Sequence, residues 1–335
     1  MTGFVGEVRM FASSFIPVGW VPCDGRELSI AQYGLAFSIV GRTYGGDGVS
    51  TFAVPDLRGR TPLGAGAGYR LTSRALGEKG GTESVTLTHA QMPTHAHGVL
   101  ASGAQATEAS PEGRTWAVAP DTAPYAPPRG SATLAPDALG TAGGGQPHAN
   151  RSPVVGLQFG LCVEGSHPLD GWDDDTAVGE VRLWAGQDPP ETWVACDGAL
   201  LPIRQHDAMF TVVGTQFGGD GVTTFAVPDL RGRVPVHVGS TSFPGSVGGA
   251  EQVTLLPTQL PQHTHPAYGT PTAATTSSPA GATWAVAGRP QYAASAQVAA
   301  AHTGSAGDTQ PHPNMPPYIA LSFIIATQGV YPDRT

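Results

Sequence analysis

A long internal duplication constrains this chain more than any single motif. Residues 5–60 recur almost unchanged at 178–233, so that VGEVRMF returns as VGEVRLW and YGGDGVSTFAVPDLRGR returns as FGGDGVTTFAVPDLRGR. The offset of 173 residues is constant and needs no gap across this segment. A repeat of roughly 165–170 residues has the length of an independent domain rather than that of a solenoid unit. The sequence therefore predicts two homologous domains in tandem.

The match continues beyond the duplicated segment, with small deletions in stretches rich in Gly, Ala, Ser and Pro, where loop length can change. VTLTHAQMPTHAH at 85–97 corresponds to VTLLPTQLPQHTH at 253–265, and GGGQPHAN at 143–150 corresponds to GDTQPHPN at 307–314. The predicted boundaries are a first domain at 1–163, an acidic linker at 164–176 and a second domain at 177–335.

Composition favours β structure with many turns. Charged residues make up 13% of the chain, about half the usual share, while it contains 46 glycines and 31 prolines. The acidic linker is best explained as a solvated spacer, with a cation site at Asp173, Asp174 and Asp175 as the alternative. Because Lys79 is the single lysine and no basic stripe exists, we expect no nucleic-acid partner.

The sequence contains neither an apolar run long enough to span a bilayer nor a secretory signal at its start. We therefore expect synthesis in the cytoplasm without a Sec signal, and no membrane insertion. Cys23 and Cys196 occupy equivalent positions in the two copies, whereas Cys162 is unmatched. This pattern predicts buried free thiols rather than a disulfide framework.

Short strands are predicted through most of the chain, because GEVRMF, TFAVP and VTLT are alternating or β-branched runs bounded by turn residues. Segments 30–41 and 203–214 each fit one short helix. Segments 101–142 and 268–306 carry TWAVA as their one strong apolar element, so we expect long irregular excursions there that carry recognition. The predicted fold class is mainly β and irregular, Gly- and Pro-rich.

The succession of GEVRMF, GWxxCDG, YGGDGxxTFAVPDLRGR, LTxxQMPxHxH and GGGQPHxN resembles the phage tail-collar family, in particular its microcystin-dependent-protein branch. The resemblance covers nearly the whole chain, twice. It implies a Gly-rich fold found at the tips and collars of tail fibres, which is trimeric and binds the host surface in short tail fibres. The first copy departs from the family ending at 151–154, and we expect its last strand to pack against the linker or the second domain.

The sharpest chemical feature is a pair of His-x-His sequences. In an extended strand His95 and His97 point the same way, about 6.5–7 Å apart, as do His263 and His265. Two imidazoles can chelate one Zn²⁺, but a closed site needs four ligands. In tail-collar trimers three such pairs surround one metal, so the resemblance makes these four histidines candidate ligands of zinc or iron. The alternative is that they hydrogen-bond to loop carbonyls and bind no metal.

The four histidines allow two metal architectures. If the domains of one chain face each other, they form one tetrahedral site per chain; if like domains trimerise, six nitrogens converge in each layer. The offset between the copies falls from 173 to 168 at the histidines, which favours independent layers. Low charge, long small-residue loops and the family resemblance predict a homotrimer or higher oligomer with two stacked layers.

Other recurrent polar residues are assigned structural roles. The PDLRGR motif is explained by Arg–carboxylate pairs that pin a turn, and the QPHxN histidine by capping of backbone groups; ligand binding is the alternative for both. Asp47 and Asp220 in GGDG indicate tight Asp-Gly turns. The residues with these structural roles are Asp56, Arg58, Arg60, Asp229, Arg231, Arg233, His148 and His312.

The sequence indicates a structural and binding protein rather than an enzyme, because no nucleophile elbow or HExxH motif occurs and the motif aspartates lie in turns. The resemblance implies a tail-fibre or collar protein that presents loops to a host-surface ligand, a glycan by analogy, alongside other tail or fibre components. The alternatives are a bacterial surface or released binding or filament-forming protein recruited from a tail fibre and, third, a glycan-cleaving tail enzyme.

Aromatic residues of the excursions are candidates for stacking against a sugar, with core packing of the two tryptophans as the alternative. The expected final location is a virion tail, a phage-like particle or the extracellular surface. The stacking candidates are Trp116, Tyr125, Trp284 and Tyr292.

Overall fold

The chain divides into two compact units, each of which contains residues from both copies of the repeat. Unit 1 comprises Met1–Val85, Ala149–Gln252 and Pro313–Thr335, and unit 2 comprises Thr86–His148 and Val253–His312. The units thus divide the chain differently from the repeat, whose boundaries remain a prediction. The computed structural model describes residues 3–13, 15–95, 98–109, 115–118, 145–168, 176–238, 243–261, 263, 269–273, 284–286, 288–289, 292–293, 298–302 and 306–332.

The main sheet of unit 1 has eight strands. Six of them follow one another side by side: β1 (Glu7–Phe11), β2 (Trp20–Pro22), β11 (Gln158–Cys162), β12 (Val181–Trp184), β13 (Trp193–Ala195) and β22 (Tyr318–Ala326). Their order is β13-β22-β12-β1-β11-β2, and all neighbours are antiparallel. The strands β1 and β12 are equivalent in the two copies and pair with each other, with Val8 opposite Leu183. One continuous sheet therefore contains both copies.

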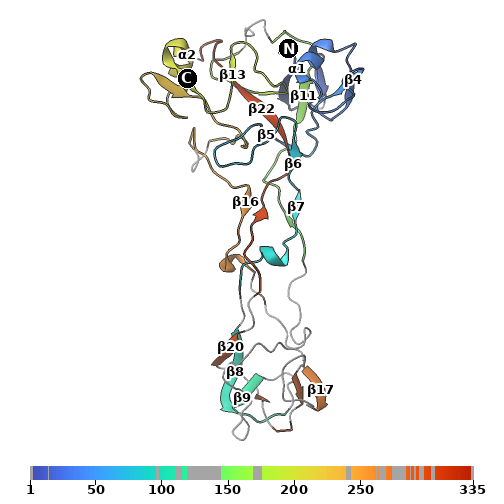
Figure 1. The fold of residues 1–335 in the computed structure, drawn as a ribbon, viewed down its shortest axis with the longest axis vertical. Coiled ribbons are helices and arrows are strands. Elements are labelled where there is room, and N and C mark those ends of the chain that lie inside the picture. The colour runs from blue at the N-terminus through green and yellow to red at the C-terminus, as the bar shows by residue number, and fades with distance from the viewer. Residues whose placement is uncertain are drawn as a thin grey trace. The chain divides into compact units, whose positions relative to one another are not determined.

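The long strand β22 also reaches from the second copy into the first (Figure 1). Its first residues pair in parallel with β5 (Thr61–Gly64) and antiparallel with β6 (Lys79–Gly80). The equivalent strand β11 is shorter and pairs with β1 and β2 of its own copy. The prediction that the last strand of the first copy packs against the linker or second domain is therefore wrong. Instead, the last strand of the second copy pairs with the first copy, and its Tyr318 and Ile319 side chains are buried there.

Each copy adds a hairpin and one short helix. The helices α1 (Gly34–Val40) and α2 (Asp207–Val213) lie within the predicted segments and bury equivalent residues, such as Val40 and Val213. A 3-10 turn, η2 (Ile203–Gln205), occupies the start of the second segment. The hairpins pair β3 (Glu27–Ser29) with β4 (Thr51–Ala53), and β14 (Leu200–Pro202) with β15 (Thr224–Ala226).

The core of unit 1 is contributed by both copies. Phe52 and Phe225, which occupy equivalent positions, are both fully buried in it. All three cysteines are buried and free, as predicted. Burial, followed by the nearby Asp197 charge, raises the pKa of Cys196 to about 12, so this thiol stays protonated at neutral pH.

The GGDG segments form tight turns, as predicted. The carboxylate of Asp47 accepts hydrogen bonds from three consecutive backbone N–H groups, of residues 49–51, and Asp220 accepts the equivalent three from residues 222–224. Gly46 and Gly219, with φ of 87° and 94°, make a turn that a side chain would disfavour.

Unit 2 contains more strand than the sequence predicts for the excursions. A four-stranded sheet has the order β19-β9-β8-β20, and β17 pairs in parallel with β18. The antiparallel pair β8 and β20 joins the two copies. Backbone pairing, both within a copy and between the copies, builds these strands without the apolar alternation that predicts a strand from sequence. Their bounds are β8 (Gly98–Gln105), β9 (Thr115–Val118), β17 (Gly269–Ala273), β18 (Trp284–Val286), β19 (Tyr292–Ala293) and β20 (Val298–His302).

Short elements occur where the chain passes between the units. They are β7 (Ser84–Val85), η1 (His89–Gln91), β10 (His148–Ala149), β16 (Gln252–Val253), η3 (Pro257–Gln259) and β21 (His312–Pro313).

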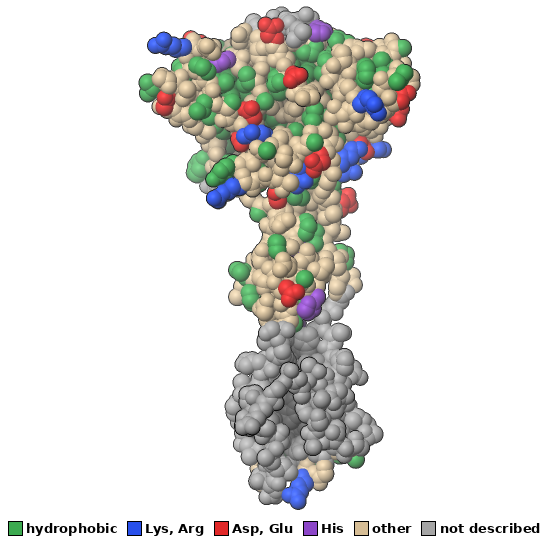
Figure 2. Space-filling view, viewed as in Figure 1, with side chains coloured by type: hydrophobic (Ala, Val, Ile, Leu, Met, Phe, Trp, Pro, Cys, Tyr) green, Lys and Arg blue, Asp and Glu red, His purple; other side chains and the backbone are tan. Residues whose placement is uncertain are grey.

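The predicted fold class, mainly β with irregular regions and short helices, is confirmed. None of the helices in the described part of the chain has the length and apolar character that a membrane crossing requires. On the face of unit 1 shown in Figure 2, acidic and basic side chains are intermingled rather than gathered by sign.

Candidate functional site

The equivalent histidines of the two copies lie side by side in unit 2. The rings of His95 and His263 meet edge to face, with centroids 5.3 Å apart and planes at 78°. Each ring follows the same local structure. The 3-10 turns η1 and η3 are capped by the side chains of Gln91 and Gln259, and each turn is followed two residues later by a proline. The local sequence therefore presents both imidazoles in the same way.

The hydrogen bonds of the two rings fix the same tautomer. Nδ1 of His95 lies 2.9 Å from the carbonyl oxygen of Pro93, and Nδ1 of His263 lies 2.9 Å from that of Pro261. A carbonyl oxygen can only accept, so each Nδ1 carries a proton, and in the neutral imidazole the lone pair is then on Nε2. This is the arrangement of a metal-binding imidazole whose other nitrogen is held by a backbone carbonyl.

The pairing of these two rings corresponds to the intrachain architecture. It differs from the independent layers that the change of offset favours, because equivalent segments of one chain run beside each other here. His97 and His265 lie outside the described residues. Within the described ranges, no group of three or more His, Cys, Asp or Glu side chains could hold a metal. The described part of the site thus fits two of the four required ligands.

Backbone pairing holds His95 in place. Its N–H donates to the carbonyl of Ala306 at 3.0 Å, and the N–H of Ala306 donates back at 2.9 Å. The backbone N–H of the neighbouring Thr94 donates to the hydroxyl of Thr309 at 2.8 Å, and the two hydroxyl groups lie 3.0 Å apart. Sequence reasoning missed both threonines, since neither is repeated in the other copy.

The second recurrent histidine also forms a pair. The rings of His148 and His312 lie 5.8 Å apart with planes at 86°. His148 is exposed, whereas His312 is 5% exposed, and its Nδ1 has no hydrogen-bond partner among the described residues. A capping role for these histidines remains a prediction.

In unit 1, the first arginine of each PDLRGR motif forms a bidentate ion pair with the aspartate of the same motif. Nε and Nη2 of Arg58 donate to the two carboxylate oxygens of Asp56 at 2.8 and 3.1 Å, and Arg231 binds Asp229 at 2.9 and 3.0 Å. The hydrogen bonds from Arg58 hold the pKa of Asp56 below its usual value. The second arginines, Arg60 and Arg233, each have a buried Nε without a hydrogen-bond partner among the described residues.

The structure describes the backbone of three of the four aromatic candidates. The backbones of Trp116 in β9 and Tyr292 in β19 are direct neighbours in register, so the sheet brings two of the candidates together. Trp284 lies in β18, opposite Gly269 of β17. Tyr125 lies outside the described residues.

Comparison with known families identifies the module that carries these elements. The family model of the phage tail collar domain matches residues 6–62 and again residues 179–235. Two stretches of this chain thus match the phage tail collar domain. Each match contains one hairpin, one helix and one PDLRGR turn of unit 1. No curated protein matches the chain. Collar domains are generally structural rather than catalytic.

Proposed function

We propose that this chain is a non-enzymatic structural and receptor-binding protein of a phage tail fibre or collar. The observation that supports this best is the double match to the tail collar domain, whose two copies form one sheet in unit 1. The excursions of unit 2 then present loops to a host-surface ligand, with a glycan as the expected class. Strand pairing between the copies, as in β8 and β20, gives these loops a common base.

The proposal includes a divalent metal held by His95, His97, His263 and His265. It is supported by the two described imidazoles, whose tautomer suits metal binding through Nε2. A bound Zn²⁺ or Fe²⁺ would have a structural rather than a catalytic role. It would cross-link the equivalent segments of the two copies, which precede the loops in the sequence. The residues themselves hold the imidazoles in place through the carbonyls of Pro93 and Pro261.

Binding can be tested with the fluorescently labelled full chain on a panel of bacterial strains and on a glycan array. We expect saturable binding to some strains, competed by their isolated surface polysaccharide. A variant in which residues 119–144 are replaced by a short Gly-Ser linker should fold and lose this binding. A variant with the equivalent length of linker inserted at the exposed Val18 controls for the change in the chain. Failure of the full chain to bind any strain or glycan would count against the proposed function.

The proposal also includes self-association as a homotrimer or higher oligomer, with other tail or fibre components as further partners. Sedimentation velocity on the purified chain at micromolar concentration tests this part. A multimer is expected, and a monomer at that concentration would contradict it.

A further inference from the structure

The two copies in unit 1 are joined by a strand exchange that runs in one direction. Residues 318–321 of β22 lie between β5 and β6 of the first copy. The N–H of Ala65 donates to the carbonyl of Leu321 at 2.8 Å, while Ala320 receives a bond from Gly77 and donates one to Glu78, each at 2.8 Å. Ile319 is 0% exposed in this slot. The slot between β5 and β6 is therefore a complete binding site for a strand.

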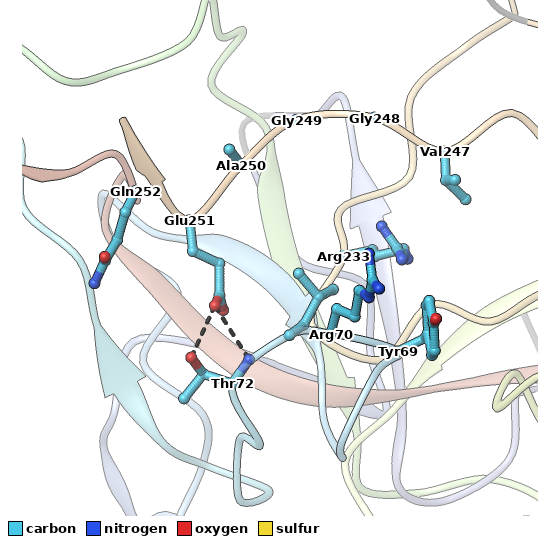
Figure 3. A pocket seen from close by; sticks show the side chains of 11 residues that line it. Tyr69, Arg70, Thr72, Arg233, Val247, Gly248, Gly249, Ala250, Glu251 and Gln252 are labelled. Atoms are coloured by element: carbon cyan, nitrogen blue, oxygen red, sulfur yellow. Dashed lines mark hydrogen bonds between the residues drawn. The ribbon is translucent and has the colours of Figure 1, made fainter. Parts of the chain in front are cut away.

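The second copy has segments equivalent to β5 and β6, and neither of them pairs with a strand in the described part of the chain. The aligned sequences place residues 234–237 at the position of β5 and residues 247–248 at the position of β6. Beside residues 247–248, the structure has a cavity of about 590 Å³ that is lined by Val247–Gln252 of the second copy and by Tyr69–Thr72 of the first (Figure 3). The equivalent wall of the first copy is covered, since the N–H of Thr82 donates to the carbonyl of Met315 at 3.0 Å.

The glycines that flank residues 247–248 have the same backbone conformation as their equivalents beside β6. Gly245 and Gly249 have φ of 84° and 83°, and the equivalent Gly77 and Gly81 have φ of 79° and 72°. This segment is also held in place, because Glu251 accepts hydrogen bonds from the backbone N–H and hydroxyl of Thr72 in the first copy at 3.1 and 2.8 Å, as Figure 3 shows.

The strand that matches the slot is also present and exposed. Residues 153–157 of the first copy, PVVGL, align with residues 317–321 of the second, PYIAL. Val155, at the position of the buried Ile319, is 85% exposed. The segment is anchored at both ends in its own copy, by the bond from the Asn150 N–H to Glu83 and by β11, so it spans the surface between two fixed points.

Because the exchange runs in one direction only, one strand and one strand-binding position remain unused within the chain. The strand of the second copy and the slot of the first are consumed within the chain; the strand of the first copy and the slot of the second are not. Half-surfaces of this kind are completed by another molecule that carries both, in a head-to-tail contact. A second copy of this chain is such a molecule.

We propose that residues 153–157 of one copy of this chain insert as a strand between residues 234–237 and 247–248 of a second copy. The register follows from the filled slot: Val154 pairs with Val234 in parallel, as Tyr318 does with Thr61, and Val155 pairs with Val247, as Ile319 does with Lys79. The insertion buries the exposed valines of both segments. It concerns assembly and does not rest on binding of a host surface.

The test uses cysteine pairs in the full chain. Strand partners bring Cα atoms within the range of a disulfide, so an untagged V155C chain mixed with a larger, tagged V247C chain should give a heterodimeric disulfide under mild oxidation. The three native cysteines are buried and leave the background low. The matched control pairs V247C with V49C, which carries its cysteine at an equally exposed valine of the first copy and should not cross-link.

A second variant checks that assembly depends on the strand. V155D should lose the assembled species in sedimentation and keep its melting temperature at high dilution, whereas V49D should keep both. Absence of the V155C–V247C heterodimer would overturn the proposal, and so would a doubly substituted chain that forms only an intramolecular disulfide at monomer mass. A multimer that persists in V155D would also overturn this interface, while leaving the proposed self-association intact.

Discussion

His95 and His263 come from equivalent positions of the two copies and face each other edge to face at 5.3 Å, each held through Nδ1 by the carbonyl of a preceding proline. Residues 168 positions apart in the sequence thus form one local site. For the proposed metal we therefore expect a stoichiometry near one metal per chain, rather than near two metals per three chains.

Elemental analysis of protein purified without a nickel column measures this ratio. The H95A/H263A variant should lose the metal, and chelation should lower the melting temperature of the wild type but not that of the variant. His237→Ala, at an exposed histidine, is the control and should retain the metal. A full metal content in H95A/H263A, or none in the wild type, would refute this prediction.

The strand exchange should dominate the stability of unit 1. Leu321 is fully buried at the point where β22 crosses to β5, so Leu321→Ala should lower the free energy of unfolding by about 2–5 kcal/mol. Leu200→Ala, at a leucine that is 60% exposed, should change it by less than about 0.5 kcal/mol. Urea denaturation followed by tryptophan fluorescence compares the two. Equal effects would mean that the exchange contributes little.

A buried ion pair links the sheet strands of the two copies. Nη1 of Arg182 lies 3.4 Å from Oε2 of Glu7, and its guanidinium stacks 4.9 Å from the ring of Trp193. Burial raises the pKa of Glu7, so its charged form depends on the nearby arginines. Removing one partner of such a pair typically costs about 3–5 kcal/mol.

Arg182→Ala should therefore destabilise the fold by roughly that amount at pH 7. The loss should shrink at acid pH, because a protonated Glu7 no longer needs a cation beside it. Denaturation of the variant and wild type between pH 7 and pH 3 gives the difference, with the exposed Arg204→Ala as control. A loss that grows as the pH falls would contradict this assignment.

The GGDG turns should also make the stability of the fold depend on pH. Hydrogen bonds from the Ser50 hydroxyl and the turn N–H groups hold the pKa of Asp47 well below its usual range, and the equivalent bonds do so for Asp220. The folded pKa thus lies below the unfolded value of about 3.9. The carboxylates stabilise the fold above about pH 4, and this contribution disappears as the pH falls through the folded pKa.

We expect D47A/D220A to melt below the wild type at pH 7 and the gap to narrow toward pH 2. Differential scanning calorimetry at stepped pH measures it, and the exposed Glu191→Ala serves as control. A gap independent of pH would show that the turns depend on shape rather than on the charge of these carboxylates.

The sequence alone determined those features of the protein that depend on local chemistry. Equal residues in equal spacing predicted the two copies, the helix positions, the Asp-Gly turns and the buried cysteines, because each of these follows from nearby residues and from burial. It also predicted which histidines recur, though the pairing of His95 with His263 was not predicted as the favoured arrangement.

Only the tertiary structure decided how the copies are joined. The sequences PYIAL and PVVGL differ by a few side chains, yet the first lies buried between two strands of the other copy and the second is exposed. Which copy donates its strand depends on long-range backbone pairing and on the space between β5 and β6, and neither leaves a periodic signal in the chain. The same holds for the pairs β8–β20 and β9–β19 of unit 2, in which each strand has a hydrogen-bond partner in the other repeat.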